Sequence, residues 1–153
     1  MSTSSTTNIP RWIAPVLKLV GLAIFVLAFF EPAVARENQN YAGWKCASVA
    51  VSFEQNIVAK PGAHHEPFEY LAGLSGLINP LILIAILLSP FRLLLTVRRV
   101  IAVLIVACMI ATWVLFAQQQ ISPLMGHYLW IAGALLVIAP ELLPASTRKA
   151  TGA

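Results

Sequence analysis

Charged residues are scarce in this chain. They make up 10% of its 153 residues, against roughly 25% in ordinary soluble domains, and aspartate does not occur in it. A water-soluble domain needs polar side chains to cover its surface, yet hydrophobic residues reach 59% here. The composition therefore excludes an ordinary soluble domain and indicates a single membrane-embedded one.

Several motifs that carry chemistry are missing as well. The sequence has no Gly-rich phosphate loop and no C-x-x-C pair, and without aspartate it has no Ser-His-Asp triad. Its cysteines are Cys46 and Cys108. Cys108 falls in the middle of a predicted membrane span, about half a bilayer from Cys46, which excludes a disulfide between them. No cofactor is indicated, and an enzyme is the less favoured class of function.

Four long apolar runs follow one another along the chain. A run of about 18 or more apolar residues crosses the hydrocarbon core as a helix, because a helix satisfies its own backbone hydrogen bonds without water. The predicted spans are residues 12–30, 68–88, 100–117 and 124–143. The predicted fold is an all-α, antiparallel bundle of four transmembrane helices. The membrane domain covers 12–144 and includes a long outer loop, 31–67.

The positive charges set the expected orientation. Lysines and arginines gather near the start of the first span, between the second and third spans, and after the fourth: Arg11, Lys18, Arg92, Arg98, Arg99, Arg148 and Lys149. The positive-inside rule then places the N-terminal tail 1–11, the link 89–99 and the C-terminal tail 145–153 in the cytoplasm, with the protein in the cell inner (plasma) membrane. The net charge of +4 reflects this topology and indicates no nucleic-acid partner.

A cleaved signal peptide is the alternative for the first span. Residues 19–30 are an apolar core behind a basic leader, and Ala33-Val34-Ala35 has the A-x-A pattern of a cleavage site. Cleavage after Ala35 would leave three spans. An uncleaved helix is favoured, because the apolar segment extends back to Ile13 and Glu31-Pro32 interrupts the approach to the site.

The outer loop is too long for a simple connection, which predicts structure of its own. Residues 44–58 fit an amphipathic helix that rests on the membrane surface or caps the bundle, with Trp44, Ala47, Val51 and Val58 on its apolar side. The same residues also alternate as a strand, but an isolated strand would have no partner. A short amphipathic helix is therefore expected.

The outer loop also holds candidates for chemistry. Cys46 is a candidate catalytic or metal-binding thiol, although a packed, inert cysteine is the favoured interpretation. His64, His65 and Glu66 are potential metal ligands in a row. Adjacent side chains diverge, so a metal site would have to recruit Glu69, Cys46 or His127 from elsewhere. Polar cover at the start of a helix, with Glu66 as its cap, is the simpler interpretation.

Charge inside the membrane is confined to the ends of the spans. Lys18 and Glu141 each lie within about two turns of the predicted inner face, where snorkelling suffices, and they can pair across the first and fourth helices. A proton- or cation-coupled carrier is expected to place a carboxylate at depth. The sequence shows none, which lowers the transporter hypothesis.

The second span is the most informative helix. One sector of it gathers Glu69, Ala72, Gly73, Gly76, Asn79 and Pro80. Pro80 kinks the helix and frees a carbonyl beside Asn79, so a ligand or ion site is conceivable there, with Glu69 at its outer mouth. A packing face with Asn79 as a polar lock is favoured, because small residues let a neighbouring helix approach. Gly126 and Gly133, one heptad apart in the fourth span, fit the same account.

Two short elements follow the apolar core of the first span: Phe30-Glu31-Pro32-Ala33, and then Gly43-Trp44-Lys45-Cys46-Ala47. In these elements and in the segment around Asn79, the chain resembles a loosely defined group of uncharacterised small bacterial inner-membrane proteins, over about residues 15–115. Glu31 stands where that pattern usually has a leucine. The resemblance implies an uncleaved first helix and a bacterial inner membrane, and it implies no activity.

Three functions are compatible with these observations. The leading hypothesis is a scaffold or accessory subunit of a membrane complex, or a homo-oligomer, with membrane lipids, other membrane subunits or itself as partners. The second is a small carrier or channel with a site at the Asn79-Pro80 helix break. The third is a thiol- or metal-dependent membrane enzyme that uses Cys46 with His64 or His65. Fold alone does not choose among them.

Overall fold

The structure, a computed structural model, describes residues 12–60, 62 and 64–142. Its helices are α1 (Ile13–Ala28), α2 (Gly43–Ala59), α3 (Pro67–Gly76), α4 (Ile78–Leu87), a short 3-10 turn (Arg92–Leu94), α5 (Leu95–Gln119) and α6 (Met125–Leu142). Its strands are β1 (Pro32–Arg36), β2 (Gln39–Ala42) and β3 (Ser122–Pro123). The predicted tails, and with them Arg11, Arg148 and Lys149, lie outside the described residues.

Three helical segments of the described chain are long and apolar enough to cross a membrane. They are Pro67–Leu87, Leu95–Gln119 and Met125–Leu142. Helix α1 is apolar too, but at 16 residues it is shorter. The structure therefore agrees with a multi-pass membrane protein. Helix α5 begins five residues before the predicted span, because nothing after Pro90 breaks a helix and arginine is a good helix former.

The second predicted span is divided in two. Helix α3 ends at Gly76 and α4 begins at Ile78, with Leu77 between them. Pro80, in the first turn of α4, has no N–H to donate to the carbonyl of Gly76 four residues earlier. The interruption thus lies where the sequence predicts a kink.

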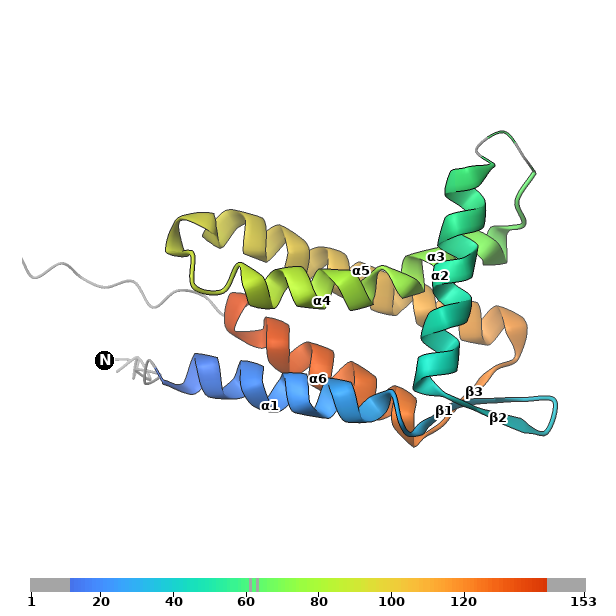
Figure 1. The fold of residues 1–153 in the computed structure, drawn as a ribbon, viewed down its shortest axis with the longest axis horizontal. Helices are drawn as coiled ribbons and strands as arrows, with labels where there is room; N and C mark the ends of the chain where they lie inside the picture. The colour runs from blue at the N-terminus through green and yellow to red at the C-terminus, as the bar shows by residue number, and fades with distance from the viewer. Residues whose placement is uncertain (1–11, 61, 63, 143–153) are drawn as a thin grey trace, which may run out of the picture.

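The long helices run between two ends of the molecule that differ in character (Figure 1). The start of α1, the α4–α5 connection and the end of α6 lie at one end, which we call the basic end because it holds Lys18 and Arg98. Helix α2 crosses the opposite end, transverse to the long helices, and we call this the α2 end. Helix α1 packs along α6, while α4 packs against both α5 and α6.

A small sheet of order β2-β1-β3 lies at the α2 end. The turn between β1 and β2 consists of Glu37 and Asn38, both with positive φ (51° and 63°), as in the two-residue turns that match the twist of paired strands. On its other edge β1 pairs with β3, which brings the α5–α6 connection against it. These strands are absent from the sequence-based prediction, because the β1–β2 turn contains no glycine and the other partner of β1, β3, lies far along the chain.

Helix α2 is confirmed, but the face that it buries differs from the expected one. Trp44, Val51 and Val58 are exposed, whereas Ala50 is buried and Phe53 packs edge-on against Phe68 of α3 at 5.9 Å between ring centroids. The packed face is the one that fits the small residues of α3, so shape overrides the apolar pattern here.

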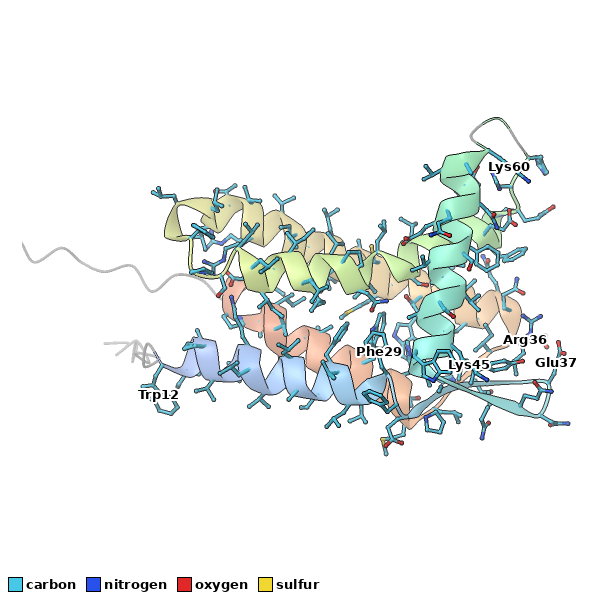
Figure 2. All side chains as sticks on the ribbon, viewed as in Figure 1. Trp12, Phe29, Arg36, Glu37, Lys45 and Lys60 are labelled. Atoms are coloured by element: carbon cyan, nitrogen blue, oxygen red, sulfur yellow. The ribbon has the colours of Figure 1, made fainter. Side chains whose placement is uncertain are left out.

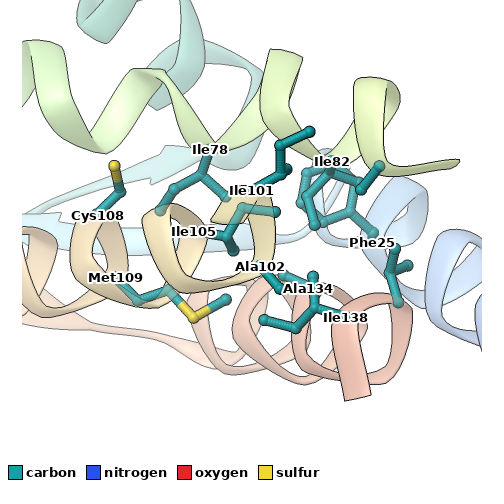
Figure 3. Packing of buried hydrophobic residues seen from close by; sticks show 12 residues of the cluster. Phe25, Ile78, Ile82, Ile101, Ala102, Ile105, Cys108, Met109, Ala134 and Ile138 are labelled. Atoms are coloured by element: carbon teal, nitrogen blue, oxygen red, sulfur yellow. The ribbon is translucent and has the colours of Figure 1, made fainter. Parts of the chain in front are cut away.

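The main core lies where four helices converge (Figure 3). Its members come from four helices, α1, α4, α5 and α6. They are Phe25 of α1, Ile78, Ile82 and Ala85 of α4, Ile101, Ala102, Ile105, Cys108 and Met109 of α5, and Ala134, Val137 and Ile138 of α6. A second cluster at the α2 end holds Ala33, Val34, Ala72, Leu115 and Phe116. The two clusters leave a space between α2 and the long helices.

Candidate functional site

A cavity of about 310 Å³ lies at the α2 end, and its lining comes from β1, β2 and all the α-helices, with Asn79 at the start of α4. This volume is at the small end of the range of about 300–1,000 Å³ found for ligand sites. Its walls are mostly apolar, and six Phe, Tyr and Trp rings take part: Phe29, Tyr41, Phe53, Phe68, Phe116 and Trp130. Since the lining comes from segments far apart in the sequence, the cavity exists only in the folded chain.

Asn79 supplies one of the two side-chain amides of the cavity wall, the other being that of Gln119. Trp130 of α6 donates its indole N–H to Oδ1 of Asn79 at 3.1 Å. In apolar surroundings such a bond holds the amide in one orientation. The carbonyl oxygen is thereby engaged, and the NH₂ group, a double donor, is the part that a ligand would meet.

His127, in the first turn of α6, is with Thr112 one of the two most deeply buried polar residues of the lining. It is 4% exposed, and its Nε2 has no hydrogen-bond partner among the described residues. Aromatic rings surround the imidazole, with centroids 4.6 Å away for Phe116, 5.4 Å for Trp113 and 5.6 Å for Trp130. Buried polar atoms without partners are uncommon because they are costly. Because His127 also lines the cavity, a molecule bound there is the candidate for the missing partner.

Two of the three hydroxyl groups of the lining donate to the backbone, and the third, that of Tyr41, donates to Gln39 Oε1 at 3.1 Å. Ser75 Oγ donates to the carbonyl of Ala72 at 2.7 Å, and Thr112 Oγ1 donates to that of Cys108 at 2.9 Å. Both oxygens remain able to accept. Because its proton is engaged with a carbonyl and not with a base, neither hydroxyl has the arrangement of an activated nucleophile.

Cys46 is half-buried and lines the cavity. Burial raises the pKa of its thiol above the ordinary value. The thiolate is the reactive form, so a raised pKa makes Cys46 a weak nucleophile at neutral pH. This agrees with the favoured interpretation of Cys46 as a packed residue.

Maleimide labelling checks this view of Cys46. In a Cys108→Ser background we expect Cys46 to react several-fold more slowly at pH 7 than a cysteine placed on the exposed face of α2 (Cys46→Ala, Ser48→Cys, Cys108→Ser). The gap should narrow at pH 9, because the thiolate fraction of Cys46 still rises with pH where an ordinary thiol is already ionised. Labelling rates followed by mass shift give the result. Equal rates at pH 7 would show that Cys46 is as accessible as an ordinary surface thiol and that its pKa is not raised.

The predicted metal ligands form a helix cap instead. His65 Nδ1 lies 3.1 Å from Glu69 Oε2, and the same oxygen accepts from the backbone N–H of Glu66 at 3.1 Å. Glu66 is the N-cap residue of α3, and it forms a capping box with Glu69. The prediction of Glu66 as a cap is therefore confirmed, and Glu69 serves the same cap. Glu69 is not part of the cavity lining.

The thiol and the histidines are far apart. Cys46 lies near the start of α2, whereas His65 contacts the carbonyl of Lys60 just after the end of α2. At about 1.5 Å per helical residue this separation is about 20 Å. His64 is exposed. Within the described ranges no group of three or more His, Cys, Asp or Glu side chains could hold a metal ion.

The small residues of the predicted packing faces do pack, but not all against membrane helices. A Cβ on Gly76 would lie 3.0 Å from Cβ of Ala50 in α2, and Ala72 and Gly73 are buried on the same side of α3. Gly126 abuts backbone carbonyls of Glu31 and Pro32, and Gly133 abuts the backbone of α1. Pro80 is exposed. Of the predicted set Asn79, Pro80 and Glu69, only Asn79 reaches the cavity.

A second polar site lies at the basic end. Lys18 Nζ lies 2.5 Å from Glu141 Oε1, and Arg98 Nη2 donates to the same oxygen. Ser89 accepts from both cations, through Oγ from Lys18 at 2.7 Å and through its carbonyl from Arg98 at 3.0 Å. The predicted Lys18–Glu141 pair is confirmed, and Arg98 is an addition. We call these three charged side chains and Ser89 the ionic cluster.

No protein family, curated protein or solved structure matches this chain. The resemblance to small bacterial inner-membrane proteins therefore stays a prediction. The function of the chain therefore has to follow from its own residues. The cavity is the place where polar groups of several helices converge on an open space.

Proposed function

We propose that this chain is a small four-span membrane protein that binds one mostly apolar small molecule in the cavity at its α2 end, as a carrier or binding protein. The observation that carries the proposal is the convergence of Asn79 and the unpartnered His127 on an apolar, aromatic-walled space. An apolar pocket with a few convergent polar groups is the usual form of a small-molecule site.

Helix α1 is counted as a membrane span in addition to the three long apolar segments. At about 1.5 Å per residue its 16 residues reach about 24 Å, somewhat less than the hydrocarbon core of about 30 Å. Local thinning of the bilayer and interfacial aromatic residues accommodate such a shortfall. Trp12 and Phe29 lie at the two ends of α1 (Figure 2), where aromatic side chains favour the membrane interface.

The orientation follows from the charges. Lys18, Arg98 and Arg99 belong to the basic end, so the positive-inside rule places this end in the cytoplasm and the α2 end outside the inner membrane. An uncleaved first helix fits the same arrangement. The A-x-A residues Ala33–Ala35 lie in β1, which pairs on both edges, and cleavage after Ala35 would cut through this strand.

The accessory-subunit hypothesis has less support than ligand binding. It relied on small-residue faces that a partner helix could approach. In the structure these residues are used within the chain: Ala72, Gly73, Gly76, Gly126 and Gly133. None of them therefore argues for a partner subunit. The enzyme hypothesis is weakened by the protonated thiol of Cys46 and by its separation from His65.

Binding of a neutral apolar fluorophore tests the proposal. We expect 1-aminoanthracene to bind the protein saturably in phosphatidylcholine nanodiscs, with one site per chain. Ser75→Trp, which places a large ring in the cavity, should weaken binding at least tenfold. The matched control is Ser52→Trp, on the exposed face of α2, which should bind as the wild type does.

A second, more conservative variant distinguishes a loss of binding from a loss of folding. Asn79→Leu keeps the size of the side chain but removes its amide and leaves the indole N–H of Trp130 without its acceptor. We expect it to weaken binding several-fold while the circular dichroism and thermal transition stay close to those of the wild type. If Ser75→Trp and Asn79→Leu both bind the fluorophore as the wild type does, the cavity is not the site.

A further inference from the structure

The charged residues that line the cavity are both cations. They are Arg36 of β1 and Lys45 of α2, and the lining includes no carboxylate. The glutamates of the same part of the chain, Glu54 and Glu69 among them, lie outside the lining. The charged side chains of the lining itself therefore favour an anion.

Neither cation is held by a buried partner among the described residues. The Nε of Arg36 lies 3.4 Å from Glu37 Oε1, but the two side chains are 50% and 82% exposed, and such an exposed pair is weak and exchanges readily. Lys45 Nζ lies 5.6 Å from the centroid of the Trp44 ring. Both residues lie at the α2 end of the molecule (Figure 2), at the rim of the cavity because they are exposed.

The buried part of the cavity favours hydrogen bonding and ring stacking over a charged group. His127 is 4% exposed with an unpartnered Nε2, and Asn79 presents its NH₂ group. The rings of Phe116 and Trp130 flank the imidazole. A plain alkyl chain would leave these polar groups unsatisfied, whereas a flat molecule with an oxygen at its inner end would stack on the rings and bond His127.

We propose that the ligand is a small aromatic or fused-ring acid, with its anionic group held between Arg36 and Lys45 and a hydroxyl or carbonyl oxygen at its other end bonded to His127 and Asn79. This inference rests on the proposed function, because it names the class of molecule that the cavity binds. The ligand is thus recognised at two points, one exposed and one buried, across an apolar body.

Four naphthalene probes of nearly equal size separate the two points of recognition: 6-hydroxy-2-naphthoate, 2-naphthoate, 2-naphthol and 2-naphthylmethylammonium. Their binding is measured by intrinsic fluorescence in phosphatidylcholine nanodiscs, with empty nanodiscs subtracted. We expect the hydroxy acid to bind tightest, each single-function probe about five- to tenfold more weakly, and the cation most weakly, as exposed charge pairs and one buried hydrogen bond predict.

Two variants should act on different probes. Arg36→Gln with Lys45→Gln should weaken both naphthoates about fivefold and leave 2-naphthol unchanged, while Lys60→Gln, a cation outside the lining, should change neither. His127→Phe, which keeps an aromatic ring among its neighbours, should weaken the two hydroxyl probes and spare 2-naphthoate. The two effects should add for the hydroxy acid, because the sites are separate.

The outcomes distinguish this inference from the proposal on which it rests. If all four probes bind equally and Ser75→Trp blocks them all, the cavity is a site but its ligand is not an acid. If no probe binds, and 1-aminoanthracene does not bind either, the proposed function fails. If phosphatidylglycerol added to the nanodiscs displaces the hydroxy acid, a lipid head group occupies the rim and the ring-acid inference is wrong.

Discussion

Replacing Glu141 by glutamine is expected to cost the folded protein about 3–5 kcal/mol of unfolding free energy, the range found when one partner of a buried ion pair is removed. The carboxylate is 3% exposed and meets the cations of both Lys18 and Arg98. Glutamine keeps the size of the side chain but leaves two cations without a counter-charge. The ionic cluster links α1, the α4–α5 connection, α5 and α6, so this loss loosens the whole basic end.

The measurement is unfolding by sodium dodecyl sulfate in mixed micelles, followed by circular dichroism. A second variant separates uncompensated charge from loss of the cluster itself. Lys18→Met, Arg98→Met and Glu141→Met together remove every charge of the cluster, and we expect this triple variant to be within about 2 kcal/mol of the wild type, since apolar replacement of buried ion pairs is often neutral. Arg98 Nε and Glu141 Oε2 are already unpartnered among the described residues, which favours that expectation. A triple variant as unstable as Glu141→Gln would show that the cluster stabilises through its bonds.

The membrane helices were the part of the fold that the sequence could predict. Helix α6 spans Met125–Leu142 against a predicted 124–143, because a lipid-facing helix must be both long and apolar. The Lys18–Glu141 pair could be predicted for a related reason: a charge near the end of a span faces either the interface or an opposite charge. Lipid restricts what a chain can do, so these patterns are informative.

The sheet could not be predicted in the same way. Its strands join through backbone atoms, which every residue carries, and the pairing of β1 with Ser122 and Pro123 connects segments far apart in the chain. The turn contains Glu37 and Asn38 but no glycine, so it lacks the Asn-Gly or Asp-Gly pattern of such turns. Ala33-Val34-Ala35 fits a cleavage site as well as it fits a strand.

The cavity could be predicted only in part, because its residues come from several elements. Asn79 could be singled out because its own helix breaks beside it, but His127, Arg36 and Lys45 come from other elements, and no spacing in the sequence relates them. The orientation of α2 was predicted wrongly for a physical reason. At a membrane surface an apolar side chain such as Trp44 or Val58 gains as much from lipid as from the protein core, so hydrophobicity does not tell which face packs.

Gly133→Ala is the second substitution with a large expected effect. A Cβ at this position would lie 2.6 Å from the backbone nitrogen of Phe25 and 2.7 Å from the carbonyl oxygen of Gly21. Both obstacles are backbone atoms of α1, which cannot swing aside as a side chain could, so α1 and α6 must move apart. We expect a loss of about 2–3 kcal/mol, the upper part of the range for overpacking.

Gly73→Ala is the matched control, because it adds the same methyl group to a helical glycine in another of the long apolar segments. Its nearest neighbours would be Glu54 Cγ and Ile57 Cδ1, both at 3.5 Å, which is ordinary contact with side chains. Alanine also favours the helix over glycine by about 0.5–1 kcal/mol, so this variant should equal or exceed the wild type in the same detergent titration. Because α1 is shorter than the three long apolar segments and is held to α6 by close backbone contact and by the Lys18–Glu141 pair, Gly133→Ala should also expose α1 to proteolysis before the other helices. Equal stability of the two alanine variants would mean that α1 does not contact α6 closely at Gly133. Helix α1 would then be held to the bundle mainly by its ends.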